Sequence, residues 1–246
     1  QRVKDAGVTA DGLTYDGYRL RVQGNAVYAV GRDTPRTAKT SPVNGAQGTW
    51  RAVVALLERM GFRWIQPGLQ GVVIPTGRSL AVPDDLNVTF KPPFMYAVGR
   101  MTNRGDWSMA NGFRCSANLF TRGGHTWVTF VSKSLWKTHP EYFRMVKGKR
   151  LEPKGHNYFL CPSNPDVQKL LADGLRRKFD QGYDMAQLGQ SDGYRPCECP
   201  ACRALDKPGE IQEQVHVPHY NVIRSVRKTH PDKFVHMLIY PPTNIP

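Results

Sequence analysis

The sequence predicts an α/β protein made of a small α+β unit over residues 1–90 and a second part over residues 91–246. Three observations lead to this prediction. The first part holds a hairpin pattern followed by one amphipathic helix. The two prolines of "FKPPF" (Phe90–Phe94) interrupt regular structure between the parts. The second part then alternates strand and helix patterns at a spacing typical of a parallel sheet.

The hairpin is predicted from "GYRLRVQGNAVYAV" (residues 17–30). Apolar and polar residues alternate from Tyr18 to Gln23, as in a strand with one buried face. Gly24 and Asn25 form a turn dipeptide, and a second β-rich run follows.

The helix of the first part is predicted from "TWRAVVALLERMGFRW" (residues 49–64). Gly61 stands where a left-handed residue commonly ends a helix, and Phe62–Ile65 is predicted to be a short buried strand. The predicted inner face of the helix consists of Trp50, Val53, Val54, Leu57 and Met60.

The second part contains four predicted strands and two predicted helices. One helix is expected at Glu210–Thr229. The strands are expected at Phe94–Met101, at the start of "GHNYFLCPSNPDVQKLLADGLRRKFDQG" (residues 155–182), in "DMAQLGQ" (184–190) and in "KFVHMLIY" (233–240). We expect all of them to run parallel, with helices outside.

The other helix begins within residues 155–182. Asn164 can cap its start, Pro165 suits its first turn, and Gly182 follows its end. The predicted inner face consists of Val167, Leu170, Leu171, Gly174, Leu175 and Phe179.

Composition narrows the classes of function. The chain has 246 residues and contains no apolar run long enough to span a membrane. It begins at Gln1 without a methionine and ends on "YPPTNIP", which predicts a fragment or processed segment. Lys and Arg number 34 against 20 acidic residues, a formal net charge of +14, which raises the question of nucleic acid or another polyanion. Neither of the densest basic clusters, Val146–Arg150 and Leu175–Phe179, is interleaved with an aromatic stacking platform. We therefore favour a solvated basic surface with no nucleic-acid partner.

Five cysteines are present, and three of them form Cys197-x-Cys199-x-x-Cys202. A structural zinc site needs four ligands. Cys161, His216 or His219 would have to supply the fourth, and no second C-x-x-C occurs. We therefore predict a metal-free, locally folded loop, with its disulfide state left open. The fifth cysteine is Cys115. No cofactor is predicted.

The loop after "DMAQLG" is the main candidate site. Gln190, Ser191, Asp192 and Gly193 follow a predicted parallel strand, where ligands commonly bind in such folds. A carboxylate there can act as an acid, a base or a polarising anion. Asp192 can equally cap its own turn, as Asp-Gly pairs often do.

A second candidate lies in "RGGHTWVTF" (residues 122–130). His125 and Trp127 together could hold a sugar, by hydrogen bonding and by stacking. The alternative is a loop histidine beside a core tryptophan. If both candidates belong to one site, His125 lies within about 15 Å of Asp192, within reach of one sugar ring. Gln190 and Tyr194 complete the predicted substrate-binding set.

Several motifs together resemble a known bacterial group. "GTWRAVVALLERMGFRWIQPGLQGVVIP" resembles the N-terminal domain of α-glucuronidases and β-hexosaminidases. "GGHTW", "HPEYFRMVKGKR", "LCPSNPDV" and "LGQSDGYRPCECPACRALD" follow in order and resemble the proteins of domain of unknown function 4838, which include glycoside hydrolase family 163. The resemblance implies a (β/α)8 barrel acting on glycans, with N-acetylglucosamine in the characterised branch, and a periplasmic or secreted location. A whole barrel takes about 250 residues, so residues 91–246 would form only its first part.

These expectations combine into a glycoside hydrolase fragment that resembles the β-N-acetylglucosaminidases and is not necessarily active alone. Glycosidases generally use two carboxyl groups. Asp192 is predicted to be one of them, with Glu198 a weaker candidate for the other, whose alternative lies beyond residue 246. An acetamido group of the substrate can replace the protein nucleophile. A non-catalytic glycan-binding protein is the alternative, and a basic nucleic-acid-binding protein is a third reading.

Overall fold

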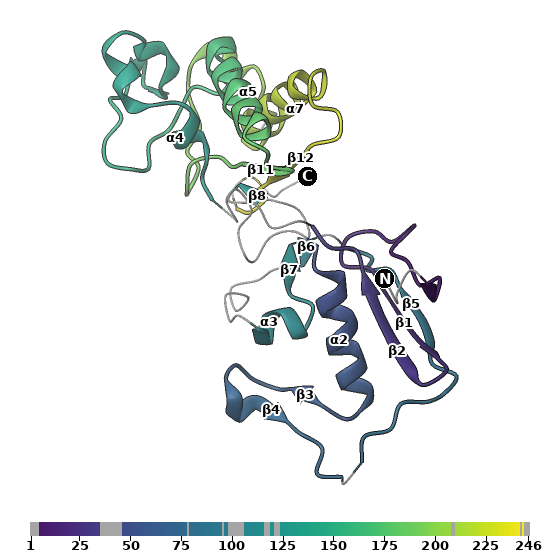
Figure 1. The fold of residues 1–246 in the computed structure, drawn as a ribbon. Coiled ribbons are helices and arrows are strands. Elements are labelled where there is room, and N and C mark those ends of the chain that lie inside the picture. Colours follow the sequence, from purple (N-terminus) through teal and green to yellow (C-terminus); the bar gives the residue numbers. More distant parts are fainter. Residues whose placement is uncertain are drawn as a thin grey trace. The chain divides into compact units, whose positions relative to one another are not determined.

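The computed structural model describes residues 5–34, 46–77, 79–94, 96–97, 106–115, 119–120, 124–207, 210–241 and 243. The chain forms two compact units, Gln1–Asn118 and Leu119–Pro246, which are coloured along the sequence in Figure 1. Both are mixed α/β structures with small sheets, so the α/β prediction is confirmed. The described strands do not close a barrel.

The first unit is built on a three-stranded antiparallel sheet. Its strands are β1 (Tyr18–Gln23), β2 (Ala26–Gly31) and β5 (Asn87–Phe90), in the order β2-β1-β5. The β1–β2 hairpin has the predicted position, and Gly24 turns the chain at φ 57°. This sheet is separate from the sheet of the second unit.

Helix α2 (Gly48–Arg59) packs on this sheet through small residues. A Cβ on Gly31 would lie 1.9 Å from the carbonyl carbon of Gly48, so the two backbones approach too closely for larger side chains. Ala52, Val54 and Ala55 are buried, while Val53 is 44% exposed. The predicted inner face is therefore wrong at Val53, because the close approach seats alanines against the sheet.

A small ribbon of two strands, each two residues long, follows α2. Gly61 adopts φ 97° just after the helix, as predicted. Strands β3 (Arg63–Trp64) and β4 (Val72–Val73) pair antiparallel, with the 3-10 turn η1 (Leu69–Gly71) between them. Ile65 is 70% exposed, so the predicted buried strand at Phe62–Ile65 is wrong: β3 belongs to this small ribbon and not to the main sheet.

Residues after the "FKPPF" segment still belong to the first unit. Strands β6 (Tyr96–Ala97) and β7 (Arg114–Cys115) pair antiparallel, and α3 (Asp106–Ala110) receives hydrogen bonds from Arg51 of α2 at its final carbonyl groups. The division between the units thus lies after Asn118 and not near residue 90. The predicted parallel strand at Phe94–Met101 is wrong at Tyr96–Ala97, and its last residues lie outside the described part.

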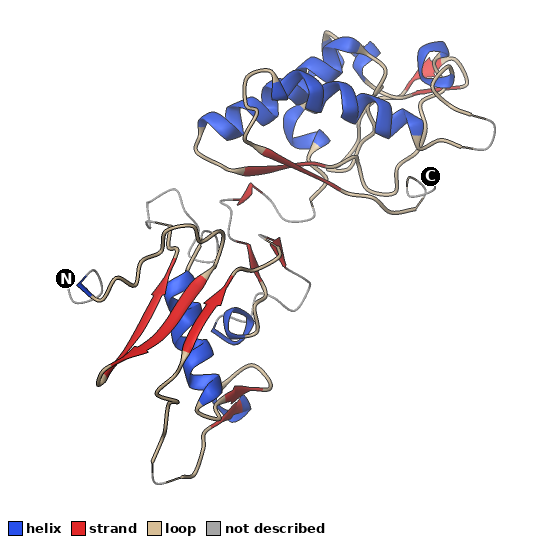
Figure 2. Cartoon of the chain, turned by 90° about the vertical axis from the view of Figure 1, so that its right-hand side faces the viewer, coloured by secondary structure: helices blue, strands red, loops and turns tan. Residues whose placement is uncertain are grey.

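The second unit contains the parallel sheet. Strands β8 (Leu119–Phe120), β11 (Met185–Leu188) and β12 (Phe234–Met237) are ordered β12-β11-β8, and both pairings are parallel. This confirms the predicted parallel arrangement of the last two strands. Helices α5 (Pro165–Asp180) and α7 (Glu213–Arg227) pack on each other and lie over one face of the sheet (Figure 2).

The ends of α5 follow the prediction. The Asn164 side chain accepts hydrogen bonds from the Asp166 and Val167 N–H groups at 2.9 and 3.2 Å, and Gly182 adopts φ 93° after the helix. The buried face agrees with the predicted one except that Leu170 is only partly buried and that Ala172 is buried as well. This helix packs on α4 (Trp127–Phe130), where a Cβ on Gly174 would lie 2.4 Å from the Phe130 ring.

The segment between α4 and α5 is irregular and antiparallel. It holds the 3-10 turns η2 (Lys133–Lys137) and η3 (Pro140–Tyr142) and the strands β9 (Met145–Val146) and β10 (Lys149–Arg150). The predicted strand before Asn164 is wrong, because Leu160 forms only an isolated antiparallel bridge with Phe143. Within the described residues, no helix combines the length and apolar character needed to cross a membrane.

Candidate active site

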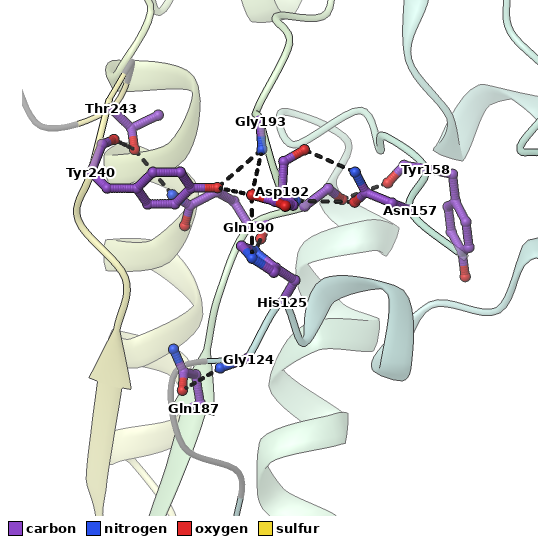
Figure 3. A network of polar contacts seen from close by, with 11 residues as sticks. Gly124, His125, Asn157, Tyr158, Gln187, Gln190, Asp192, Gly193, Tyr240 and Thr243 are labelled. Carbon is purple, nitrogen blue, oxygen red and sulfur yellow. Dashed lines mark hydrogen bonds and ion pairs between the residues drawn. The ribbon is translucent and has the colours of Figure 1, made fainter. Parts of the chain in front are cut away.

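The candidate site lies at the carboxyl ends of the three parallel strands. His125 comes after β8, Asp192 after β11 and Tyr240 after β12. Figure 3 shows these three side chains converging, with Gly193 and Asn157 beside them. Because parallel strands end at one edge, three distant segments of the sequence meet there.

A close approach of two backbone segments places His125 beside β11. The Thr126 hydroxyl donates to the carbonyl oxygen of Gln187 (2.7 Å) and accepts from the N–H of Gly189 (3.0 Å). A Cβ on Gly189 would lie only 2.3 Å from the carbonyl oxygen of Gly124. Glycine at position 189 is therefore required for this approach. Gly123, also part of the predicted motif, lies outside the described residues.

His125 and Asp192 form a His–carboxylate pair. The His125 Nε2 atom lies 3.5 Å from Asp192 Oδ1, which confirms the expected proximity of the two residues. The His125 Nδ1 atom lies 2.7 Å from the carbonyl oxygen of Gln190. Because a carbonyl only accepts hydrogen bonds, Nδ1 carries a proton, and Nε2 is the ring nitrogen that faces the carboxylate.

Tyr240 is a site residue that the sequence did not reveal. Its hydroxyl donates to Asp192 Oδ1 at 3.1 Å, and the Gly193 N–H donates to the same oxygen at 2.9 Å. Burial, assisted by the neighbouring carboxylate of Asp192, raises the pKa of the Tyr240 phenol, so this hydroxyl stays protonated at neutral pH. Its place at the end of the last apolar strand, directly before two prolines, is the signal that could have identified it.

The backbone of Asp192 is fixed while its carboxylate is open. Asn157 accepts from the Asp192 N–H (3.0 Å) and donates to the Asp192 carbonyl (2.9 Å), and Ser191 donates to the Tyr158 carbonyl. The Asp192 side chain is 66% exposed. Its bond from the Gly193 N–H shows that Asp192 also caps its own turn. The described partners of this carboxylate all meet Oδ1, so Oδ2 is the oxygen left for a ligand.

Comparison with known proteins assigns the chain to a family. The model of the domain of unknown function DUF4838 matches residues 66–246, which is well over half of the chain. The chain belongs to the DUF4838 family. No curated protein matches it. Among solved structures, an α-galactosidase from Lactobacillus brevis is similar at 14% identity and a TM-score of 0.27, over 42% of this chain and 14% of the other. A likeness of that size carries no inference about fold or activity.

Two aromatic residues predicted to bind substrate lie in the core of the DUF4838 chain. Trp127 is fully buried, and its Nε1–H donates to Nε2 of His219 at 3.0 Å. Burial lowers the pKa of His219 to about 3, so its ring is neutral and can accept this bond. Tyr194 is also buried and donates to Gln214. Neither ring can stack on a ligand, because α4 directs Trp127 inward while His125 faces the strand ends.

Gln190 is likewise buried, and it contacts residues of the site through both its side chain and its backbone. Its side-chain amide donates to the Thr243 hydroxyl at 3.0 Å, and its backbone carbonyl holds His125. The buried Gln190 side chain is not exposed to a substrate, and the residue instead orients the His125 ring through its backbone carbonyl.

Glu198, the weaker carboxylate candidate, belongs to the cysteine loop. Its carboxylate accepts from the Lys147 N–H at 2.7 Å and pairs with Arg203 at 3.5 Å, and its own N–H donates to the Met145 carbonyl. These described contacts tie the loop to the β9–β10 hairpin. None of them involves the network of Figure 3, so the structure does not support Glu198 as the partner of Asp192.

The cysteine loop has a fourth sulfur that its local spacing does not show. Cys161 lies 3.5 Å from the Cys199 sulfur and 3.8 Å from the Cys202 sulfur, and the Sγ atoms of these three residues and Cys197 all lie within 4.8 Å of one another. Of the three residues that the sequence offered as a fourth ligand, Cys161 is the one that joins this group. The fold brings Cys161 across 36 residues of sequence to complete the group, as the separation of Cys161 and Cys197 shows.

Proposed function

We propose that this DUF4838 chain is part of a glycoside hydrolase that acts on glycans, with an N-acetylglucosamine-containing substrate as the first candidate. One observation carries the proposal. The exposed carboxylate of Asp192 stands at the carboxyl ends of three parallel strands, and His125 and Tyr240 converge on it from the other two. This edge is where catalytic residues lie in barrel enzymes. The sequence motifs that resemble glycoside hydrolase family 163 support the same reading.

The topology of the second unit supports a (β/α)8 barrel as the complete scaffold. Its strands follow one another in space in their sequence order, β8, β11 and β12, and α5 and α7 cover the same face (Figure 2). Successive crossovers of one hand and one direction place all helices on one side of a sheet. The other side is then buried by closure of the sheet on itself.

Each residue of the network has a proposed role. Asp192 polarises the reacting group, which for an N-acetylglucosaminide is the acetamido group that attacks the anomeric carbon. Tyr240 and Gly193 hold Oδ1 of this carboxylate, so that Oδ2 meets the substrate. His125, oriented by the bond of its Nδ1–H to the Gln190 carbonyl, presents Nε2 as a hydrogen-bond partner for a sugar hydroxyl. A second carboxyl group, required to protonate the leaving oxygen, comes from another strand end of the complete barrel.

The test is hydrolysis by the full-length protein of 4-nitrophenyl N-acetyl-β-glucosaminide and of N-acetylglucosamine-containing glycans. We expect release of nitrophenol or sugar by the wild type and loss of this activity in Asp192→Asn, which keeps an oxygen at Oδ1 but cannot carry the charge. Normal turnover of the variant would reduce Asp192 to a turn residue and overturn the assignment.

A non-catalytic glycan-binding protein is the second candidate. It is favoured by the absence of a second carboxylate among the described contacts of the His125–Asp192–Tyr240 network. Saturable glycan binding by the full-length protein, without release of product, would support this candidate. We propose no nucleic-acid partner, and DNA binding that weakens steeply with salt would contradict this.

A further inference from the structure

Four cysteine sulfurs converge in the second unit. Cys161 lies just before α5, and the other three belong to the loop that follows β11 and to α6 (Pro200–Arg203). All four side chains are buried, with at most 4% of each residue exposed. Among the described residues, this is the one group of three or more potential metal ligands that are close enough to share an ion.

The spacing of the sulfurs matches a tetrahedral site. Four sulfurs at about 2.3 Å from a zinc ion lie about 3.8 Å from one another. The Cys161 sulfur lies 3.5 Å from that of Cys199 and 3.8 Å from that of Cys202. A disulfide would bring one pair to about 2.05 Å and leave the others apart. Here Cys161 is nearly equidistant from two partners, as a corner of a tetrahedron is.

Donors around the cluster suit sulfurs that carry negative charge. The Met145 N–H donates to the Cys197 sulfur at 3.2 Å, and the Arg150 guanidinium lies 3.8 Å from the same sulfur. The Ser163 hydroxyl lies 3.0 Å from the Cys202 sulfur. A zinc ion with four thiolates carries two net negative charges, and these donors offset them.

We propose that Cys161, Cys197, Cys199 and Cys202 bind one structural Zn²⁺ ion. Four protein ligands close the coordination shell, which leaves no position for substrate or water and distinguishes a structural site from a catalytic one. The spacing C-x-C-x-x-C predicted a metal-free loop because its fourth ligand is distant in sequence. Once Cys161 is in place, the ligand set is complete.

The proposed zinc site joins the segment before α5 to the loop after β11, and the same two segments also contact each other at Asp192. Asn157 exchanges two hydrogen bonds with the backbone of Asp192, and Ser191 bonds the Tyr158 carbonyl. A few residues further along the same segments, Cys161 meets the cysteine loop. Zinc thus acts as a second link between them, so it positions the loop of Asp192 without touching the proposed substrate.

The first measurement is the metal content of the purified full-length protein, produced with added zinc and without a metal-binding tag. We expect one zinc per chain that survives dialysis, and four thiols that react with a thiol reagent only after chelation. Exchange for Co²⁺ should give the visible ligand-field bands and sulfur-to-metal charge transfer of a tetrahedral thiolate site. Zinc-free protein with two disulfides by mass spectrometry, or protein that binds only iron, would overturn the proposal.

Variants test which residues bind the ion. Cys161→Ser should lose stoichiometric zinc, while the matched Cys115→Ser in the first unit should keep it. Because Cys161→Ser could also destabilise the unit, chelation of the wild type provides an independent measurement. It should remove the zinc and lower Tm by more than about 10 °C, reversibly on zinc addition. Stoichiometric zinc in Cys161→Ser would contradict the ligand assignment. These readouts do not depend on hydrolytic activity, so they stand or fall separately from the proposed function.

Discussion

The parallel sheet of the second unit carries a His–Asp pair at each end. At the carboxyl ends of the strands, His125 Nε2 lies 3.5 Å from Asp192 Oδ1. At the amino ends, His230 Nε2 lies 3.2 Å from Asp180 Oδ1, just before β12 and β11 begin. The two aspartate side chains are 66% and 68% exposed. Neither the distance nor the exposure tells the pairs apart.

The partners of each pair make the difference. Asp192 is reached by Tyr240 from a third strand end. His230, in contrast, is bonded by the adjacent Thr229 hydroxyl and packs on Phe179, and Asp180 is the last residue of α5. The pair at the amino ends of the strands therefore links the end of α5 to the segment that follows α7. The same two residue types are expected to serve stability at one end of a sheet and chemistry at the other.

Replacement of the two carboxylates should change turnover by very different amounts. Asp192→Asn should lower turnover by the full-length protein at least ~100-fold, because asparagine cannot supply the charge. The matched change Asp180→Asn should leave turnover within about twofold, since exposed ion pairs contribute only about 0–1 kcal/mol to stability. Steady-state kinetics with thermal melts of both variants provide the comparison. Equal losses of turnover in the two would remove the distinction between the pairs.

Replacement of the two histidines, His125 and His230, should have a smaller effect, which we expect mainly in KM. His125→Ala removes one hydrogen-bonding ring nitrogen from the open site, so kcat/KM should fall about tenfold, mostly through KM. His230→Ala serves as the control and should leave kcat/KM unchanged. A loss of Tm in His125→Ala larger than that in His230→Ala would instead indicate that His125 is structural.

Tyr240→Phe tests the contribution of Tyr240, the site residue that follows β12, and we expect a smaller effect on turnover than for Asp192→Asn. It removes only the hydroxyl that holds Asp192 Oδ1, while the Gly193 N–H still donates to this exposed oxygen, so the net loss should be about 1 kcal/mol. We expect kcat to fall about fivefold or more with Tm unchanged. Tyr220, which is 62% exposed on α7, provides the control as Tyr220→Phe. A variant that behaves like wild type would limit the site to His125 and Asp192.

The smallest effect is expected at Asn157. Asn157→Ala removes the acceptor for the Asp192 N–H and the donor to the Asp192 carbonyl without adding a charge. Loss of these two exposed hydrogen bonds, of about 0.5 kcal/mol each, should reduce kcat/KM a few-fold while Tm stays within a few degrees. A larger loss than in His125→Ala would place Asn157 itself in contact with substrate.

Features that depend on neighbouring residues could be predicted from the sequence alone. The hairpin turn at Gly24, the cap of α5 at Asn164 and the helix end at Gly61 each arise from local backbone preferences, and each appears where it was predicted. The apolar runs of β11 and β12 were equally readable, and so was the position of Asp192 after the first of them.

Contacts between residues that are distant in sequence could be found only from the folded chain. Small residues at the α2–sheet contact turned Val53 outward, and the short step from His125 to Trp127 sent one ring to the strand ends and the other into the core. Tyr240 reached Asp192, and Cys161 reached the cysteine loop, across long stretches of chain. Local patterns carry no information about such partners, because the parallel sheet and its helices alone bring those segments into contact.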